Sequence, residues 1–418
     1  MDLTASRRGR RALFTALYFV EGAPIGFLWW ALPALLRARG VEPQRIGALL
    51  GWLVLPWAFK WVWSPLIDRF QGPRWTLRAW IAAAQVGMVL SLVPLLMIDP
   101  VERFEELVWA LLAHAVCAST QDAAIDALMI RVTPEGERGR LTGWMQVGML
   151  AGRSLLGGGA LLVHGQVGGR RLTGGLLAAL VLGIALAATY RAPVGNRTRA
   201  SVGASPGFGA LLAGTLRGRA TWIGLAFAAT AGAGFEALGG FAGPLLTDAA
   251  GGSTDAAGRF FLVHAVLATA LGGLAGGWLA DRVGVRRATA ACGLALGAAV
   301  LACAWRVQGT PAPGELTWLL VAVYLGVGGF TAASYALFMR LTDRRLAATQ
   351  FSAFMGATNL CESWSVAAAG RLIPVWGYGL SFGALEILAL AALCLLPLAR
   401  RTGPGVLHHT SEEGPRPV

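Results

Sequence analysis

The sequence predicts an all-α membrane protein in which twelve transmembrane helices form two pseudo-symmetric six-helix bundles. Three observations lead to this fold class: an apolar composition, the regular recurrence of long apolar segments and an internal repeat. Of the 418 residues, 56% are hydrophobic and only 14% are charged, whereas about a quarter of an average soluble protein is charged. The mean hydropathy of +0.59 therefore favours a chain that lies mostly in lipid.

Twelve segments meet the requirement for a membrane span, which is about 20 mainly apolar residues across roughly 30 Å of hydrocarbon. The predicted spans are 12–36, 45–66, 77–97, 106–129, 141–164, 172–190, 220–246, 260–280, 288–307, 315–339, 347–370 and 379–399. The predicted regions are an N-terminus (1–11), a first bundle (12–190), a linker rich in Gly, Ser, Pro and Arg (191–219), a second bundle (220–400) and a tail (401–418). An even number of spans places both termini on one side of the membrane.

The basic residues indicate which side that is. A net charge of +13 could suggest a nucleic-acid partner, but such binding needs basic residues gathered on one solvated face. Here they come in short groups between apolar segments. If the termini are inside, 24 arginines lie in inside segments and 9 in outside segments, which is the bias of cytoplasmic loops. We therefore expect an inner-membrane protein with cytoplasmic N and C termini, a lipid bilayer around it and no nucleic-acid partner.

The two predicted bundles share matching landmarks. Segment 127–133 closes the fourth span and resembles segment 336–342, which closes the tenth; segment 66–69 ends the second span and resembles segment 279–282 at the end of the eighth. Two matches at nearly the same offset indicate an internal repeat related by an axis along the membrane normal.

The sequence contains little that points to enzyme chemistry. The five cysteines lie in apolar segments without CxxC spacing, so we expect neither a disulfide nor a metal site. Phosphate-binding loops, zinc-protease motifs and nucleophile elbows are also missing from the sequence. We predict that the protein is not an enzyme and needs no cofactor.

One loop carries a recognisable motif. Residues 277–287 closely resemble the loop signature of major facilitator transporters through Gly277, Asp281, Arg282, Gly284, Arg286 and Arg287. Gly277 is expected to let helices approach and Gly284 to permit a tight turn, while Asp281 and the arginines would form ion pairs that rearrange at a gate. The first half keeps only a degraded copy that ends in Asp68 and Arg69. The alternative is a basic loop with a turn.

Further segments resemble the AmpG-type muropeptide permeases, a branch that also resembles the acetyl-CoA transporters. The segments are 59–69, 117–122 with Asp126, 134–139 with Arg153, and 348–351. Glu362 departs from this pattern, in which an arginine is expected. The resemblance implies the major facilitator fold and a small polar or anionic solute, such as an amino sugar or muropeptide, carried by alternating access and driven by a proton gradient.

Charged residues inside predicted spans are the first candidates for function, because a charge at the bilayer centre costs about 2.5–3.5 kcal/mol on insertion scales. Asp122 and Asp126 lie four residues apart on one helix face, so repulsion or desolvation should raise the proton affinity of at least one of them. With Glu21, they are the proton-coupling candidates. The alternative is permanent neutralisation, of Asp126 by Arg131 or a loop arginine and of Asp122 by Arg153 or Lys60.

The substrate-binding candidates are Arg153, Glu236, Glu362, Lys60, Gln121, Trp29 and Trp30. A guanidinium such as that of Arg153 grips a carboxylate or phosphate in a forked geometry, although this residue could instead be only a counter-ion to Asp122. Trp29 and Trp30 could stack on a sugar or anchor the chain at the membrane interface. Alternatives to a proton-coupled importer are an efflux permease and a transporter-like assembly factor without flux. We expect a monomer.

Overall fold

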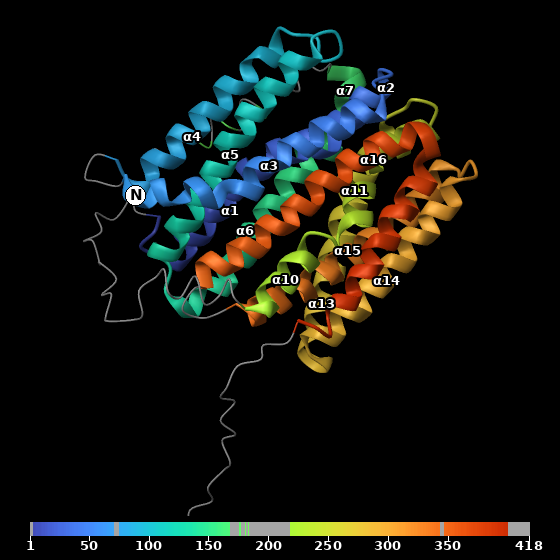
Figure 1. Ribbon diagram of the computed structural model, residues 1–418. Helices are drawn as coiled ribbons and strands as arrows, with labels where there is room; N and C mark the ends of the chain where they lie inside the picture. Colours follow the sequence, from blue (N-terminus) through green and yellow to red (C-terminus); the bar gives the residue numbers. More distant parts are fainter. Residues whose placement is uncertain are drawn as a thin grey trace, which may run out of the picture.

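The computed structural model describes residues 3–70, 75–167, 175–176, 180, 183, 218–342 and 347–399, and these residues form helices joined by short turns (Figure 1). Nine helical segments in this part of the chain are long and apolar enough to cross a membrane. Most of predicted span 172–190, most of linker 191–219 and all of tail 401–418 fall outside the described residues.

The N-terminal half is built from long helices, three of which change pitch. Its elements are α1 (Arg7–Gly26), the π-helix η1 (Phe27–Ala31), α2 (Leu32–Ala38), α3 (Pro43–Arg69), α4 (Leu77–Leu92), the 3-10 helix η2 (Val93–Leu96), α5 (Phe104–Val132), α6 (Glu135–Arg153), the π-helix η3 (Ser154–Gly159) and α7 (Ala160–Val167). Helix α5 is not among the nine candidate spans, because polar residues 119–122 lower the hydropathy of its 29 residues.

The C-terminal half is also built mainly from long helices. Its elements are α10 (Arg219–Ala228), α11 (Ala233–Ala249), α12 (Asp255–Arg259), the π-helix η4 (Phe260–His264), α13 (Ala265–Val283), α14 (Val285–Val307), α15 (Pro313–Leu341), α16 (Ala347–Ala392) and the 3-10 helix η6 (Leu393–Leu395). Two helices merge in α16 across Gly377, whose φ of 73° breaks the helix. The break lies between predicted spans 347–370 and 379–399, as the sequence indicates.

Ion pairs distinguish the two ends of the molecule. At the N-terminal end, which carries Arg7, the side chains of Arg7 and Arg10 each donate to Glu137 at 2.6 Å. The hydrogen bond from Arg10 is the main reason that the pKa of Glu137 is lowered. At the opposite, distal end, Arg39 donates to Asp99 at 2.7 Å. That bond, with backbone N–H groups, lowers the pKa of Asp99 to about 2, so this carboxylate stays ionised at neutral pH.

The signature loop between α13 and α14 is partly as predicted. Gly284 has a φ of +85° and forms the turn. Asp281 forms no ion pair with any described residue, whereas Arg286 donates to the carbonyl of Ala399 at 2.5 Å. The close helix approach predicted at Gly277 is wrong: a Cβ there would meet nothing within 4 Å, while one at Gly276 would lie 2.3 Å from the carbonyl oxygen of Gly329.

Replacing Gly284 with alanine should therefore destabilise the protein by about 1 kcal/mol, because a residue with a Cβ is strained at positive φ. Gly277→Ala is the matched control seven residues earlier, with open space for its Cβ, and should be neutral or slightly stabilising in the helix. Melting temperatures of the two purified variants in the same detergent test this. Equal melting temperatures would contradict the strain argument.

Candidate functional site

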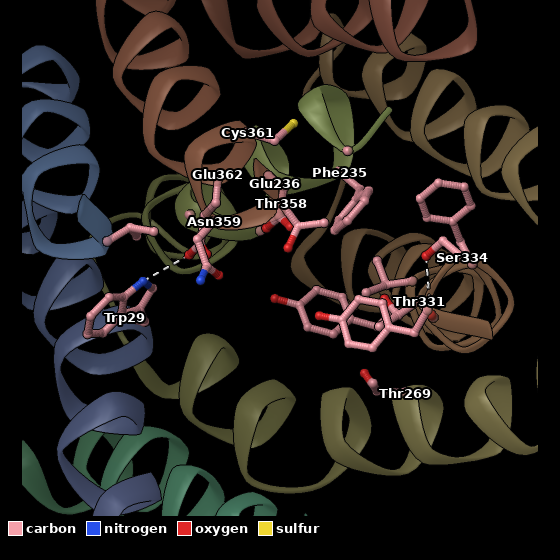
Figure 2. Close-up of a pocket in the computed structure, with 18 of the residues that line it drawn as sticks. Trp29, Phe235, Glu236, Thr269, Thr331, Ser334, Thr358, Asn359, Cys361 and Glu362 are labelled. Carbon is pink, nitrogen blue, oxygen red and sulfur yellow. Dashed lines mark hydrogen bonds between the residues drawn. The ribbon is translucent and has the colours of Figure 1, made fainter. Parts of the chain in front are cut away.

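A cavity of about 360 Å³ lies between the two halves, at the level of the pitch changes in the helices (Figure 2). Its N-terminal wall comes from α1, η1, α3 and α6, and its C-terminal wall from α10, α11, α13, α15 and α16. The volume falls within the roughly 300–1,000 Å³ range of small-molecule sites. A ligand here would contact both halves at once.

Three charged side chains line the cavity, namely Arg153 from α6, Glu236 from α11 and Glu362 from α16. The indole Nε1 of Trp29 donates to Glu362 Oε1 at 3.0 Å, and this hydrogen bond joins the two halves (Figure 2). Arg153 makes neither a hydrogen bond nor an ion pair with any described residue, and its Nε is buried without a partner. The side chain of Glu236 has no hydrogen-bond partner within the described part of the chain either.

The remaining cavity wall offers neutral hydrogen-bonding groups and aromatic rings. The polar set is Thr269, Thr331, Ser334, Tyr324, Tyr335, Thr358 and Asn359. Trp30 also lines the cavity and stacks on Phe261, with ring centroids 4.9 Å apart. Sequence reasoning did not identify Asn359 or Tyr324, because neutral polar residues are common inside transmembrane helices and give no separate signal.

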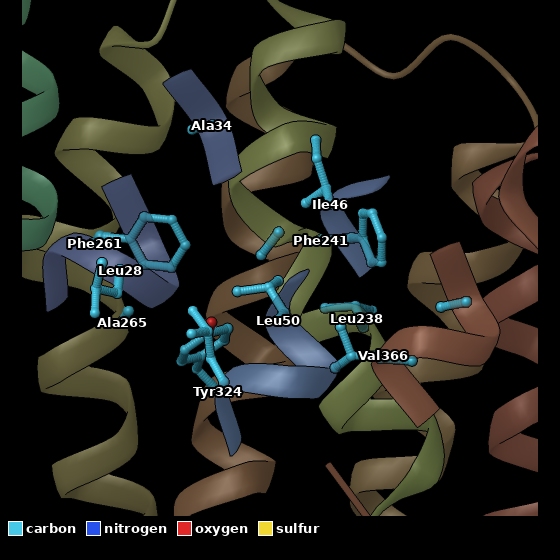
Figure 3. Close-up of a cluster of buried hydrophobic side chains, with 14 of the residues drawn as sticks. Leu28, Ala34, Ile46, Leu50, Leu238, Phe241, Phe261, Ala265, Tyr324 and Val366 are labelled. Atoms are coloured by element: carbon cyan, nitrogen blue, oxygen red, sulfur yellow. The ribbon is translucent and has the colours of Figure 1, made fainter. Parts of the chain in front are cut away.

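Packing between the halves closes the cavity towards the distal end. Side chains from both halves form a buried apolar layer (Figure 3) that includes Leu28, Ile46, Leu50, Leu238, Phe241, Phe261, Tyr324 and Val366. Beyond this layer, Arg37 pairs with Asp248 at 2.8 Å, and the hydroxyl of Tyr378 donates to the same carboxylate at 2.9 Å. Ser363 adds a hydrogen bond to the carbonyl of Gly51 at 2.8 Å.

The proton-coupling candidates form a separate cluster within the N-terminal half. Lys60 Nζ lies 2.6 Å from Asp122 Oδ2, and the hydroxyl of Tyr18 donates to Asp126 Oδ1 at 2.7 Å. Glu21 is 2% exposed, and its Oε2 has no hydrogen-bond partner in the part of the chain that the structure describes. Of the counter-ions considered from sequence, Lys60 rather than Arg153 holds Asp122, while the partner shown for Asp126 is a neutral hydroxyl.

The structure divides the substrate-binding candidates into two groups. Arg153, Glu236, Glu362, Trp29 and Trp30 line one cavity, as a binding site requires. Lys60 and Gln121 lie outside its lining: Lys60 pairs with Asp122, and Gln121 is fully buried with no hydrogen-bond partner for its side-chain amide among the described residues. The side chains of Asp68 and Arg69 fall outside the described residues, so their predicted gating role stays a prediction.

The fold and the cavity define a class of protein. Solved structures that are similar to the chain include a nucleoside transporter, with 11% identity, a TM-score of 0.70 and coverage of 93% of this chain and 98% of that one. A D-xylose–proton symporter is similar with 14% identity, a TM-score of 0.69 and coverage of 93% and 95%. The chain therefore has the fold of these major facilitator transporters, and nine helical segments of its described part are long and apolar enough to cross a membrane.

The sequence relatives are more specific. The chain is 26% identical to the anhydromuropeptide permease of Escherichia coli strain K12 over 407 residues, which cover 94% of this chain and 80% of the permease. It is 24% identical to the putative transporter AmpG 4 of Rickettsia felis over 398 residues, covering 91% and 94%. No family model matches the chain. The resemblance to the AmpG-type permeases is thus confirmed along nearly the whole chain.

Proposed function

We propose that the protein is a proton-coupled secondary transporter that moves a small polar solute by alternating access. The observation that carries the proposal is a cavity lined from both halves that holds a guanidinium and a carboxylate with no hydrogen-bond partner among the described residues. The separate cluster of Asp122, Asp126 and Glu21, in which Asp122 and Glu21 are buried and Asp126 is partly buried, is the proposed proton site. Its separation from the cavity suits a mechanism in which a proton changes the conformation without competing with the solute for one group.

The proposal includes the finer topology: twelve spans in two six-helix bundles, in the inner membrane, with both termini in the cytoplasm. On this orientation the N-terminal end faces the cytoplasm and the distal end faces outwards. The apolar layer and the pair between Arg37 and Asp248 close the outer side, so the conformation described is closed to the outside. An amino sugar or an anhydromuropeptide is a suitable solute, as the name of the relative suggests.

Asp122→Asn should reduce uptake driven by a proton gradient at least about tenfold, because a neutral amide cannot be protonated and cannot hold Lys60 as an ion pair. Uptake of anhydromuropeptide and of amino sugars into proteoliposomes, with and without an imposed gradient, measures this. Asp255→Asn, at an exposed aspartate of α12, is the matched control and should transport normally.

Uptake by Asp122→Asn that still depends fully on the gradient would contradict the proton site. The assembly-factor alternative predicts a different result. No solute would be transported, and another membrane protein would co-purify stably with the chain. Export rather than import would appear as transport only from vesicles with the inverted orientation.

A further inference from the structure

The cavity holds more negatively than positively charged side chains, and this imbalance indicates which charges a solute should carry. Two carboxylates, Glu236 and Glu362, face one guanidinium, Arg153. Trp29 donates a hydrogen bond to Glu362, so one carboxylate is supported by the protein. Glu236 and Arg153 remain without hydrogen-bond partners in the described part of the chain. Charged groups withdrawn from water are costly unless they are paired, and a ligand can supply the missing partners.

The two unpartnered groups have opposite signs and lie on opposite halves. Arg153 belongs to α6 in the N-terminal half and Glu236 to α11 in the C-terminal half, and the two groups interact electrostatically without forming an ion pair. Arg153 also interacts with Glu362 and with Glu21 behind the cavity. A solute that carries only negative charge would satisfy Arg153, but it would leave Glu236 unpaired and would be repelled by both cavity carboxylates.

We propose that the cavity binds a zwitterion, with the protonated amine of the solute at Glu236 and its carboxylate at Arg153. The inference rests on the proposed transport function and names its substrate class: an amino-acid-like or amino-sugar-acid solute with little or no net charge. Asn359 and Thr358, on the same wall as Glu362 (Figure 2), supply neutral hydrogen bonds for the body of the solute. Because the two charged ends contact different halves, the bound zwitterion would also draw the halves together.

Three probes of one ring size test the proposal by isothermal titration with the full chain in detergent. Muramic acid carries an amine and a carboxylate, N-acetylmuramic acid only the carboxylate, and glucosamine only the amine. Muramic acid should bind at least about tenfold more tightly than either of the others, since each loses one charge-assisted contact. Equal or tighter binding of N-acetylmuramic acid would overturn the proposal, as would no binding of muramic acid.

Variants assign each end of the solute. Glu236→Gln should weaken muramic acid binding about tenfold and change N-acetylmuramic acid binding less than about threefold, while Arg153→Gln should remove the advantage of muramic acid over glucosamine. Glu105→Gln, at an exposed glutamate of α5, is the matched control and should bind like the unaltered protein. Unchanged muramic acid binding by Glu236→Gln would overturn the assignment of the amine.

Transport assays separate this inference from the proposed function. If muramic acid binds with the expected selectivity but is never taken up by proteoliposomes, the transport function fails and the zwitterion site stands. If the protein accumulates N-acetylmuramic acid in preference to muramic acid, the transport function stands and the zwitterion site fails.

Discussion

Lys60→Met is expected to lower the free energy of unfolding by about 3 kcal/mol, because it leaves the Asp122 carboxylate without its cation at a poorly solvated position. The side chains of Lys60 and Asp122 are only 25% and 12% exposed. The pair between Arg103 and Glu106 provides the contrast, since its side chains are 52% and 54% exposed. Arg103→Met should therefore cost no more than about 1 kcal/mol. Denaturation of the purified variants in the same mixed micelles measures both.

A double variant separates the ion pair from simple loss of packing. Lys60→Met combined with Asp122→Asn should recover more than half of the stability lost by Lys60→Met alone, because the second change removes the unpaired charge. Additive losses, or a stable Lys60→Met protein, would show that the pair is not structurally important.

The ion pair also refines the proton-coupling hypothesis. A proton that binds Asp122 must displace the Lys60 ammonium, which lies 2.6 Å away, whereas Asp126 and Glu21 have no cation at that distance within the described residues. If the cluster takes up protons, as proposed, Asp126 or Glu21 is therefore expected to be protonated before Asp122.

Hydropathy predicted the long helices in the described part of the chain. In lipid a segment must satisfy its own backbone hydrogen bonds, so a long apolar segment forms a helix rather than a loop or an open strand. Of the charged residues in such segments, Arg153, Glu236 and Glu362 line the cavity, whereas Glu21 and Asp122 do not. Their functional roles stay predictions. The π-helices η1, η3 and η4 were not predicted. They depend on packing between helices that are distant in sequence, as where Ser154 of η3 donates to the carbonyl of Leu262 in η4 at 2.5 Å.

Pairings within the site were predicted less well, because they depend on how each helix is rotated about its axis. Spacing showed that Asp122 and Asp126 share a face, but not that this face turns from the cavity towards Lys60 and Tyr18. The internal repeat predicted from the sequence illustrates this dependence on helix rotation. Thr331 and Tyr335 occupy the equivalent positions in α15, and both line the cavity. Positions matched by the predicted repeat thus belong to a charge cluster in one half and to the cavity lining in the other.

The position of Arg153 depends on very close packing between α1 and α6. Gly22 and Gly26 on α1 lie against the backbone of α6, and Gly148 and Gly152 on α6 lie against the backbone of α1; in each pair the glycines are four residues apart, which is the small-residue spacing that lets membrane helices approach. A Cβ at Gly26 would lie 2.3 Å from the carbonyl oxygen of Arg153, and one at Gly152 would lie 2.3 Å from that of Phe19. The glycines therefore set both the distance between the helices and the place of the guanidinium in the cavity.

Gly152→Val should destabilise the protein by about 3 kcal/mol, because a branched side chain facing backbone atoms forces the two helices apart. Gly143→Val on the same helix is the matched control: a Cβ there meets nothing within 4 Å, so the change should cost less than about 1 kcal/mol. The yield of monodisperse protein and its melting temperature distinguish the variants. If the two valine variants have the same melting temperature, the contact between α1 and α6 does not hold Arg153 in place. If Gly152→Val folds but loses affinity for carboxylate-bearing probes, the packing acts on the site more than on the fold.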